Sequence, residues 1–91
     1  MKTFDSLWIE LNKKVDSSPD TERSSSSTLA ALGNGTHFIA KKVVEEASEV
    51  MLAAESQSKG ELSEEISQLL YWIQVLMLDK AVTLDDVYRR L

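Results

Sequence analysis

A cluster of glutamates at helical spacing offers the first candidate for chemistry in this sequence. Glu45, Glu46 and Glu49 lie in a segment whose apolar residues recur at helical intervals. Further along the chain, Glu65 and Gln68 stand three residues apart among mostly apolar side chains. Oxygen ligands that meet across two packed helices suit a hard cation such as Mg²⁺. Gln68 stands where a second carboxylate would complete the set.

Helix geometry separates Glu46 and Glu49 from Glu45 within the glutamate cluster. At about 100° per residue, Glu46 and Glu49 share one flank of the expected helix with Lys42, while Glu45 points away from them. The same geometry predicts an apolar stripe facing the core, made of Val43, Ala47, Val50 and Ala54. Ala53 lies on the flank of the acids, where a small side chain leaves room for a ligand or a close helix.

The acids also have an ordinary explanation as solvent-exposed charges. Lys42 followed by glutamates is a common pattern of charge pairing on a helix surface. His37 near a helix start fits a polar or capping role better than catalysis. Trp8 and the Tyr71–Trp72 pair fit a core or an interface better than a substrate stack.

Helices account for most of the chain. Apolar periodicity predicts a first helix over 3–16, and the polar stretch 17–28 is expected to be a flexible loop whose last residues begin a short helix over 27–32. Gly33-Asn34-Gly35 is expected to end that helix, with left-handed backbone. A long helix capped by Thr36 and a second long helix spanning 61–79 follow. Thr83 caps a short last helix.

Chain length and sequence pattern predict the fold class. The 91 residues form a single domain, 1–91, and no β alternation appears, so we expect an all-α antiparallel bundle of about four to five helices. The expected helix 61–79 is apolar around most of its circumference, which predicts a homodimer that completes the core.

Charge and cysteine usage exclude several other classes. A net charge of −5 without a basic patch argues against nucleic acid, and no apolar run spans a membrane. The lack of cysteine excludes thiolate chemistry and fits a reducing compartment. The N-terminus lacks a signal-peptide layout, so a cytoplasmic location is expected.

Three segments of the chain, 26–32, 37–50 and 65–72, resemble phosphoribosyl-ATP pyrophosphatase, a member of the MazG-like all-α nucleoside-triphosphate pyrophosphohydrolases. The resemblance covers roughly residues 3–91. Where that family has Glu-x-x-Asp followed by Leu-Leu-Tyr-His, this chain has Gln68 for the aspartate and Trp72 for the histidine. Ser27 stands where an aromatic residue is common.

The resemblance implies an enzyme that hydrolyses phosphoribosyl-ATP to phosphoribosyl-AMP and pyrophosphate, the second step of histidine biosynthesis, with Mg²⁺. It implies that Glu46, Glu49 and Glu65 bind the metal, with Gln68 offering a carbonyl oxygen. The implied catalytic residues are Glu45, Glu46 and Glu49, and the implied contacts to substrate phosphate are Ser26, Thr28 and Lys42.

Two alternatives stay open at this point. The first is a house-cleaning pyrophosphohydrolase of the same fold that acts on a noncanonical nucleoside triphosphate. The second is a non-enzymatic helical dimerisation module whose acids are simply solvated.

Overall fold

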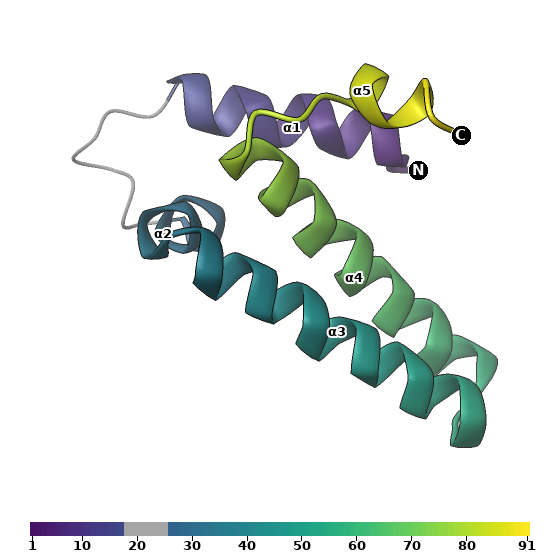
Figure 1. Cartoon of the computed structure of the whole chain (residues 1–91). Helices are drawn as coiled ribbons and strands as arrows, with labels where there is room; N and C mark the ends of the chain where they lie inside the picture. Colours follow the sequence, from purple (N-terminus) through teal and green to yellow (C-terminus); the bar gives the residue numbers. More distant parts are fainter. Residues whose placement is uncertain (18–25) are drawn as a thin grey trace.

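The two longest helices form an antiparallel hairpin, and the shorter helices pack around the end of it that is far from the hairpin turn (Figure 1). The computed structural model describes residues 1–17 and 26–91. The helices are α1 Phe4–Ser17, α2 Ser27–Asn34, α3 Thr36–Ser56, α4 Lys59–Asp79 and α5 Leu84–Tyr88. The predicted all-α class is confirmed, since these residues contain helices and no strand. None of these helices combines the length and apolar character needed to cross a membrane.

The core lies where α2, α3 and α4 meet. Ala31, Ile39 and Val75 contribute one buried side chain from each helix, and partly buried residues of all three helices pack around them. On α3 the buried residues are Ile39 and Ala53. The predicted core stripe is therefore wrong for the single chain, because Ala47 and Ala54, two of its members, are exposed.

The reason is that α3 carries two apolar faces. The face that packs against α4 contains Ile39 and Ala53 with Glu46 midway, each two helical turns from the next. A second apolar face contains Val44 and Met51, which are 68% and 57% exposed. Sequence periodicity predicts a stripe that lies between these two faces, because the face that becomes buried is interrupted by a glutamate.

A glycine makes the corner between α2 and α3. Gly35 closes α2 and opens α3 with φ +91° and ψ 174°, a conformation that only glycine adopts readily. Gly33 and Asn34, expected to end α2, are instead its last residues. The predicted capping role of Thr36 is also wrong: Thr36 is the first residue of α3, and its hydroxyl donates to the Asp79 carboxylate at 2.5 Å.

The hairpin turn between α3 and α4 is shorter than expected. Helix α4 begins at Lys59 rather than at residue 61, because Ser58 and Glu61 form a reciprocal capping box. Thr83 caps α5 in the same way with Asp86, as predicted for that threonine.

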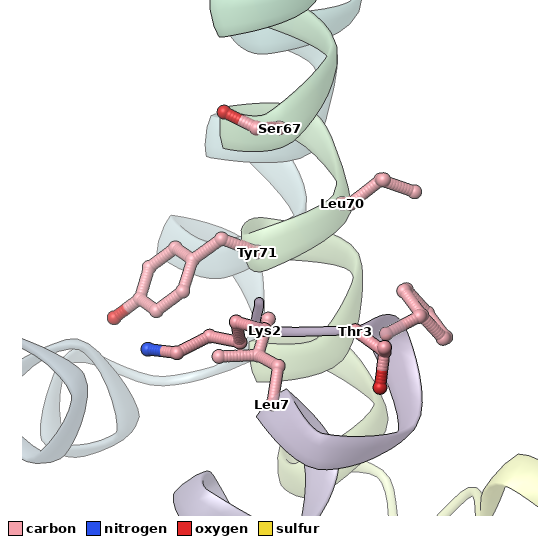
Figure 2. Close-up of a pocket in the computed structure, with 7 residues that line it drawn as sticks. Lys2, Thr3, Leu7, Ser67, Leu70 and Tyr71 are labelled. Carbon is pink, nitrogen blue, oxygen red and sulfur yellow. The ribbon is translucent and has the colours of Figure 1, made fainter.

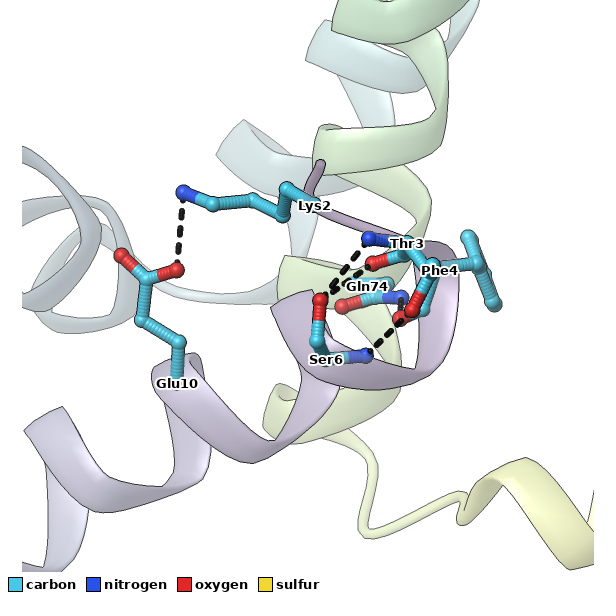
Figure 3. Close-up of polar contacts among 6 residues, drawn as sticks. All are labelled: Lys2, Thr3, Phe4, Ser6, Glu10 and Gln74. Atoms are coloured by element: carbon cyan, nitrogen blue, oxygen red, sulfur yellow. Dashed lines mark hydrogen bonds and ion pairs between the residues drawn. The ribbon is translucent and has the colours of Figure 1, made fainter.

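Polar contacts attach the start of α1 to α4 (Figure 3). The buried Gln74 side chain donates from Nε2 to the Phe4 carbonyl oxygen at 2.7 Å. Thr3 caps α1 by accepting from the Ser6 backbone, as predicted, and α1 ends at Ser17. Of the predicted loop 17–28, positions 18–25 lie outside the described residues, and its last two residues belong to α2.

The corner geometry yields a matched pair of glycine substitutions. Gly35→Ala forces a side chain into a glycine-only conformation and is expected to cost about 1–3 kcal/mol of unfolding free energy. Gly33→Ala adds a methyl group that meets nothing within 4 Å in a helix, and is expected to stabilise by about 0.5–1 kcal/mol. Urea denaturation at one protein concentration measures both, and equal effects of the two variants would contradict the assigned corner.

Candidate functional site: an acidic seam between two helices

Glu46 lies on the face of α3 that packs against α4. It stands two helical turns after Ile39 and two before Ala53, and both of these side chains are fully buried. Glu46 is itself half-buried, and its Oε2 atom is shielded from solvent without a hydrogen-bond partner among residues 1–17 and 26–91. An unpartnered buried oxygen costs free energy, so packing alone does not account for a glutamate at this position.

Glu65 of α4 lies in the same negatively charged environment. Partial burial raises the pKa of the Glu65 carboxyl, and the negative charges of Glu46, Glu49 and Glu64 raise this pKa further. The structure therefore places Glu46 and Glu49 of α3 within electrostatic range of Glu65 of α4, and these are three of the predicted ligands. We call these three residues the acidic seam.

The side chains of the acidic seam do not converge on one point in the structure. Across the described part of the chain, no group of three acidic or histidine side chains is close enough to hold a metal ion. Gln68, the fourth predicted ligand, is exposed on α4 about one turn beyond Glu65. Coordination requires the side chains to converge from these positions.

Lys42 brings a positive charge to the same helix as two of the acids. Its Nζ atom lies 3.4 Å from a Glu45 carboxylate oxygen and 5.7 Å from the centre of the Phe38 ring. Glu45 thus pairs with the predicted phosphate-binding lysine, while Glu46 faces α4. The helix geometry had placed Lys42 on the flank of Glu46 and Glu49, so its contact with Glu45 instead matches ordinary charge pairing on a helix surface.

The two predicted hydroxyls occupy structural positions at the start of α2. Ser26 is the N-cap, and its side chain accepts from the Leu29 backbone nitrogen at 3.5 Å. Thr28 is only 2% exposed, and its Oγ1 atom lies 2.5 Å from the Tyr71 hydroxyl oxygen. A phosphate contact by Thr28 would require this hydroxyl to share or exchange its bond with Tyr71.

A separate hollow lies beside the N-terminus of α1 (Figure 2). Its volume is about 300 Å³, and its wall is mostly apolar. The lining residues are Lys2, Thr3, Phe4, Leu7, Ser67, Leu70 and Tyr71. None of the predicted site residues is among them, so this hollow is distinct from the acidic seam.

Comparison with known proteins decides the family. A family model described as phosphoribosyl-ATP pyrophosphohydrolase matches residues 9–91. The chain belongs to this family. Its members are hydrolases that act on a phosphoanhydride in histidine biosynthesis. The resemblance found in the sequence is thereby confirmed, and the matched residues include every predicted site position.

Sequence reasoning assigned no role in the site to two aromatic residues that lie near it. Tyr71 provides the partner of the Thr28 hydroxyl, and Phe38 lies beneath the Lys42 ammonium. Both were treated as parts of the core or of the family pattern. A usable signal existed for Tyr71, because a tyrosine hydroxyl on a buried helix generally requires a hydrogen-bond partner.

The raised pKa of Glu65 predicts a pH-dependent stability. A native pKa above the ordinary value of 4.5 means that the folded chain binds this proton more tightly than the unfolded chain. The destabilising contribution of the Glu65 carboxylate to the folded state is absent below pH 4.5, and it grows as pH rises through the native pKa. Without divalent cations, Glu65→Gln should therefore melt at a higher temperature than wild type at pH 7, and this difference should shrink toward pH 4.

Paired thermal melts at the two pH values measure this difference. Glu55→Gln, an exposed glutamate near the end of α3, is the matched control and should show a smaller difference. A Glu65→Gln variant less stable than wild type at pH 7 would refute the repulsion inferred for the acidic seam.

Proposed function

We propose that this protein hydrolyses phosphoribosyl-ATP to phosphoribosyl-AMP and pyrophosphate with Mg²⁺ bound at the acidic seam. The family assignment supports the reaction. The observation that supports the metal is the buried Oε2 atom of Glu46, which has no hydrogen-bond partner within the described chain and lies in the electrostatic field that acts on Glu65. A divalent cation would supply the missing partner and offset the repulsion among the three carboxylates.

The donor set fits a hard divalent cation. Glu46, Glu49 and Glu65 offer carboxylate oxygens, and Gln68 offers a neutral carbonyl oxygen, all ligands that Mg²⁺ accepts. When bound there, Mg²⁺ would screen the negative charge of the polyphosphate and make a water molecule more acidic. Glutamine in place of a fourth carboxylate lowers the negative charge of the site by one unit without removing an oxygen ligand.

The remaining roles belong to side chains around the acidic seam. Lys42 binds a phosphate oxygen, and the Ser26 and Thr28 hydroxyls are proposed as further phosphate contacts from the start of α2. Water attacks phosphorus, the α–β phosphoanhydride bond breaks, and pyrophosphate leaves. The proton of the attacking water passes to a glutamate oxygen. Glu49 suits this step because its side chain is exposed, whereas Glu45 is paired with Lys42.

The chain also presents a surface suited to a second copy of itself. Val44 and Met51 of α3 are more than half exposed, and Ile66 and Leu70 of α4 are 40% and 39% exposed. Large apolar side chains gathered on one helical hairpin mark an interaction surface, and a 91-residue chain gains core by pairing. We therefore infer a homodimer that covers these faces, as the sequence predicted.

We place the protein in the cytoplasm, with the small-molecule reactions of amino-acid biosynthesis. Cell fractionation tests this location, and recovery in the membrane pellet would contradict it. A house-cleaning pyrophosphohydrolase of the same fold remains the alternative activity. Comparing phosphoribosyl-ATP with a panel of canonical and noncanonical nucleoside triphosphates separates the two, because the proposed enzyme prefers the phosphoribosylated substrate.

Glu49→Gln tests the metal and base assignments together. Pyrophosphate release from phosphoribosyl-ATP should fall by about 10²-fold or more, because the substitution removes a carboxylate charge and a proton acceptor. Glu55→Gln, on the same helix and away from the seam, should retain activity near that of wild type. Chelation of Mg²⁺ should abolish turnover and its restoration should recover it. Equal activity of the two glutamine variants would contradict the assignment of Glu49 as metal ligand and proton acceptor.

Sedimentation at micromolar concentration tests the assembly. The expected mass is twice that of one chain. Met51→Glu, which places a charge on the exposed apolar face, should shift the population toward the single-chain mass while the circular dichroism of the helices is retained. A single-chain mass for the wild-type protein would contradict the homodimer.

A further inference from the structure

Three aromatic side chains form a connected group between the core and the site. The Trp72 ring forms a T-shaped pair with Tyr71, with ring centres 5.4 Å apart and planes at 79°. It forms a second T-shaped pair with Phe38, at 6.3 Å and 70°. All three are partly buried against the core of Ala31, Ile39 and Val75. Edge-to-face pairs of this kind favour a defined ring orientation, so Trp72 restricts where the Phe38 ring can lie.

The Lys42 ammonium lies over the Phe38 ring. These residues are four apart on α3, one helical turn, and Nζ lies 5.7 Å from the ring centre. That distance is within the range over which a ring face attracts a cation. The opposing contact of Nζ is the Glu45 carboxylate at 3.4 Å. The ammonium is thus contacted by both an aromatic face and an anion.

The two contacts of Lys42 differ in what happens when a polyphosphate arrives. The ion pair with Glu45 involves two side chains that are 36% and 47% exposed, so it is weak and screened by salt. Phosphate oxygens compete for the same N–H donors and can replace the carboxylate. The ring does not compete, because it attracts the ammonium without accepting those bonds. Phe38 can therefore hold Lys42 in place while its anionic partner changes.

We propose that Phe38 and Trp72 are positioning residues for the phosphate-binding Lys42: Phe38 holds the ammonium, and Trp72 fixes Phe38. This inference rests on the proposed function for the role of Lys42, but not for the arrangement itself. Trp72 stands where the resembled family pattern has histidine, so this chain builds the support from a larger ring that reaches both Phe38 and Tyr71.

The first test uses the protein without substrate. In the wild-type protein, the side-chain protons of Lys42 next to Nζ should show an upfield NMR shift from the ring of Phe38. Phe38→Leu should return this shift to that of an ordinary lysine, and Trp72→Phe should reduce it. Phe4→Leu and Trp8→Phe, which change the other phenylalanine and the other tryptophan of the chain, should leave it unchanged.

The second test uses turnover. Phe38→Leu should raise KM for phosphoribosyl-ATP by about two- to fivefold, with a smaller change in kcat, because it removes the attraction that holds a binding cation. Phe38→Tyr should restore KM. In a Lys42→Met background, Phe38→Leu should have no further effect on KM, since the two residues act through one contact.

The outcomes separate this inference from the proposed function. An ordinary Lys42 shift in the wild-type protein overturns the positioning role, and this result needs no folded variant. A KM effect that persists in the Lys42→Met background also overturns it, because Phe38 would then act through general stability. A wild-type protein that shows the shift but does not cleave phosphoribosyl-ATP refutes the proposed function and leaves the aromatic support of Lys42 standing.

Discussion

The packing of α3 against α4 is the constraint on which the rest of the molecule depends. Ile39 and Ala53 are fully buried at the two ends of this contact, and Ala53 has a side chain small enough for close approach of the helices. The same contact sets Glu46 opposite α4, near Glu65, and sets Phe38 against Trp72. A shift of α3 by one turn along α4 would separate both pairs, so core and site share one register.

Placing a glutamate in that contact works against stability. The Glu46 Oε2 atom loses hydration and finds no hydrogen-bond partner in the described chain, and its charge helps to raise the pKa of Glu65. An apolar residue at this position would extend the line from Ile39 to Ala53 without interruption. The acid is best explained by the ligand it is proposed to bind, which would compensate for the lost hydration and the repulsion.

Residue patterns predicted the helices, but not which face of α3 packs against α4. Helix caps such as Thr3 and Thr83 act locally, so they can be recognised from neighbouring residues. The face of α3 that becomes buried depends on tertiary contact. The predicted stripe of Val43, Ala47, Val50 and Ala54 lies between the two apolar faces of α3, because Glu46 interrupts the face that becomes buried. Likewise, the Thr28–Tyr71 bond joins residues 43 apart in the sequence, a pairing that no local pattern reveals.

The most direct test of this account is the unfolding free energy of Glu46→Met, measured by urea denaturation with and without Mg²⁺. Methionine keeps the length and helical preference of the side chain while removing the charge. Without Mg²⁺ we predict a gain of about 1–3 kcal/mol, the usual cost of an unsatisfied buried polar group. We also predict that Mg²⁺ stabilises the wild-type protein but not the variant. A less stable variant, or equal stabilisation of both by Mg²⁺, would contradict the account.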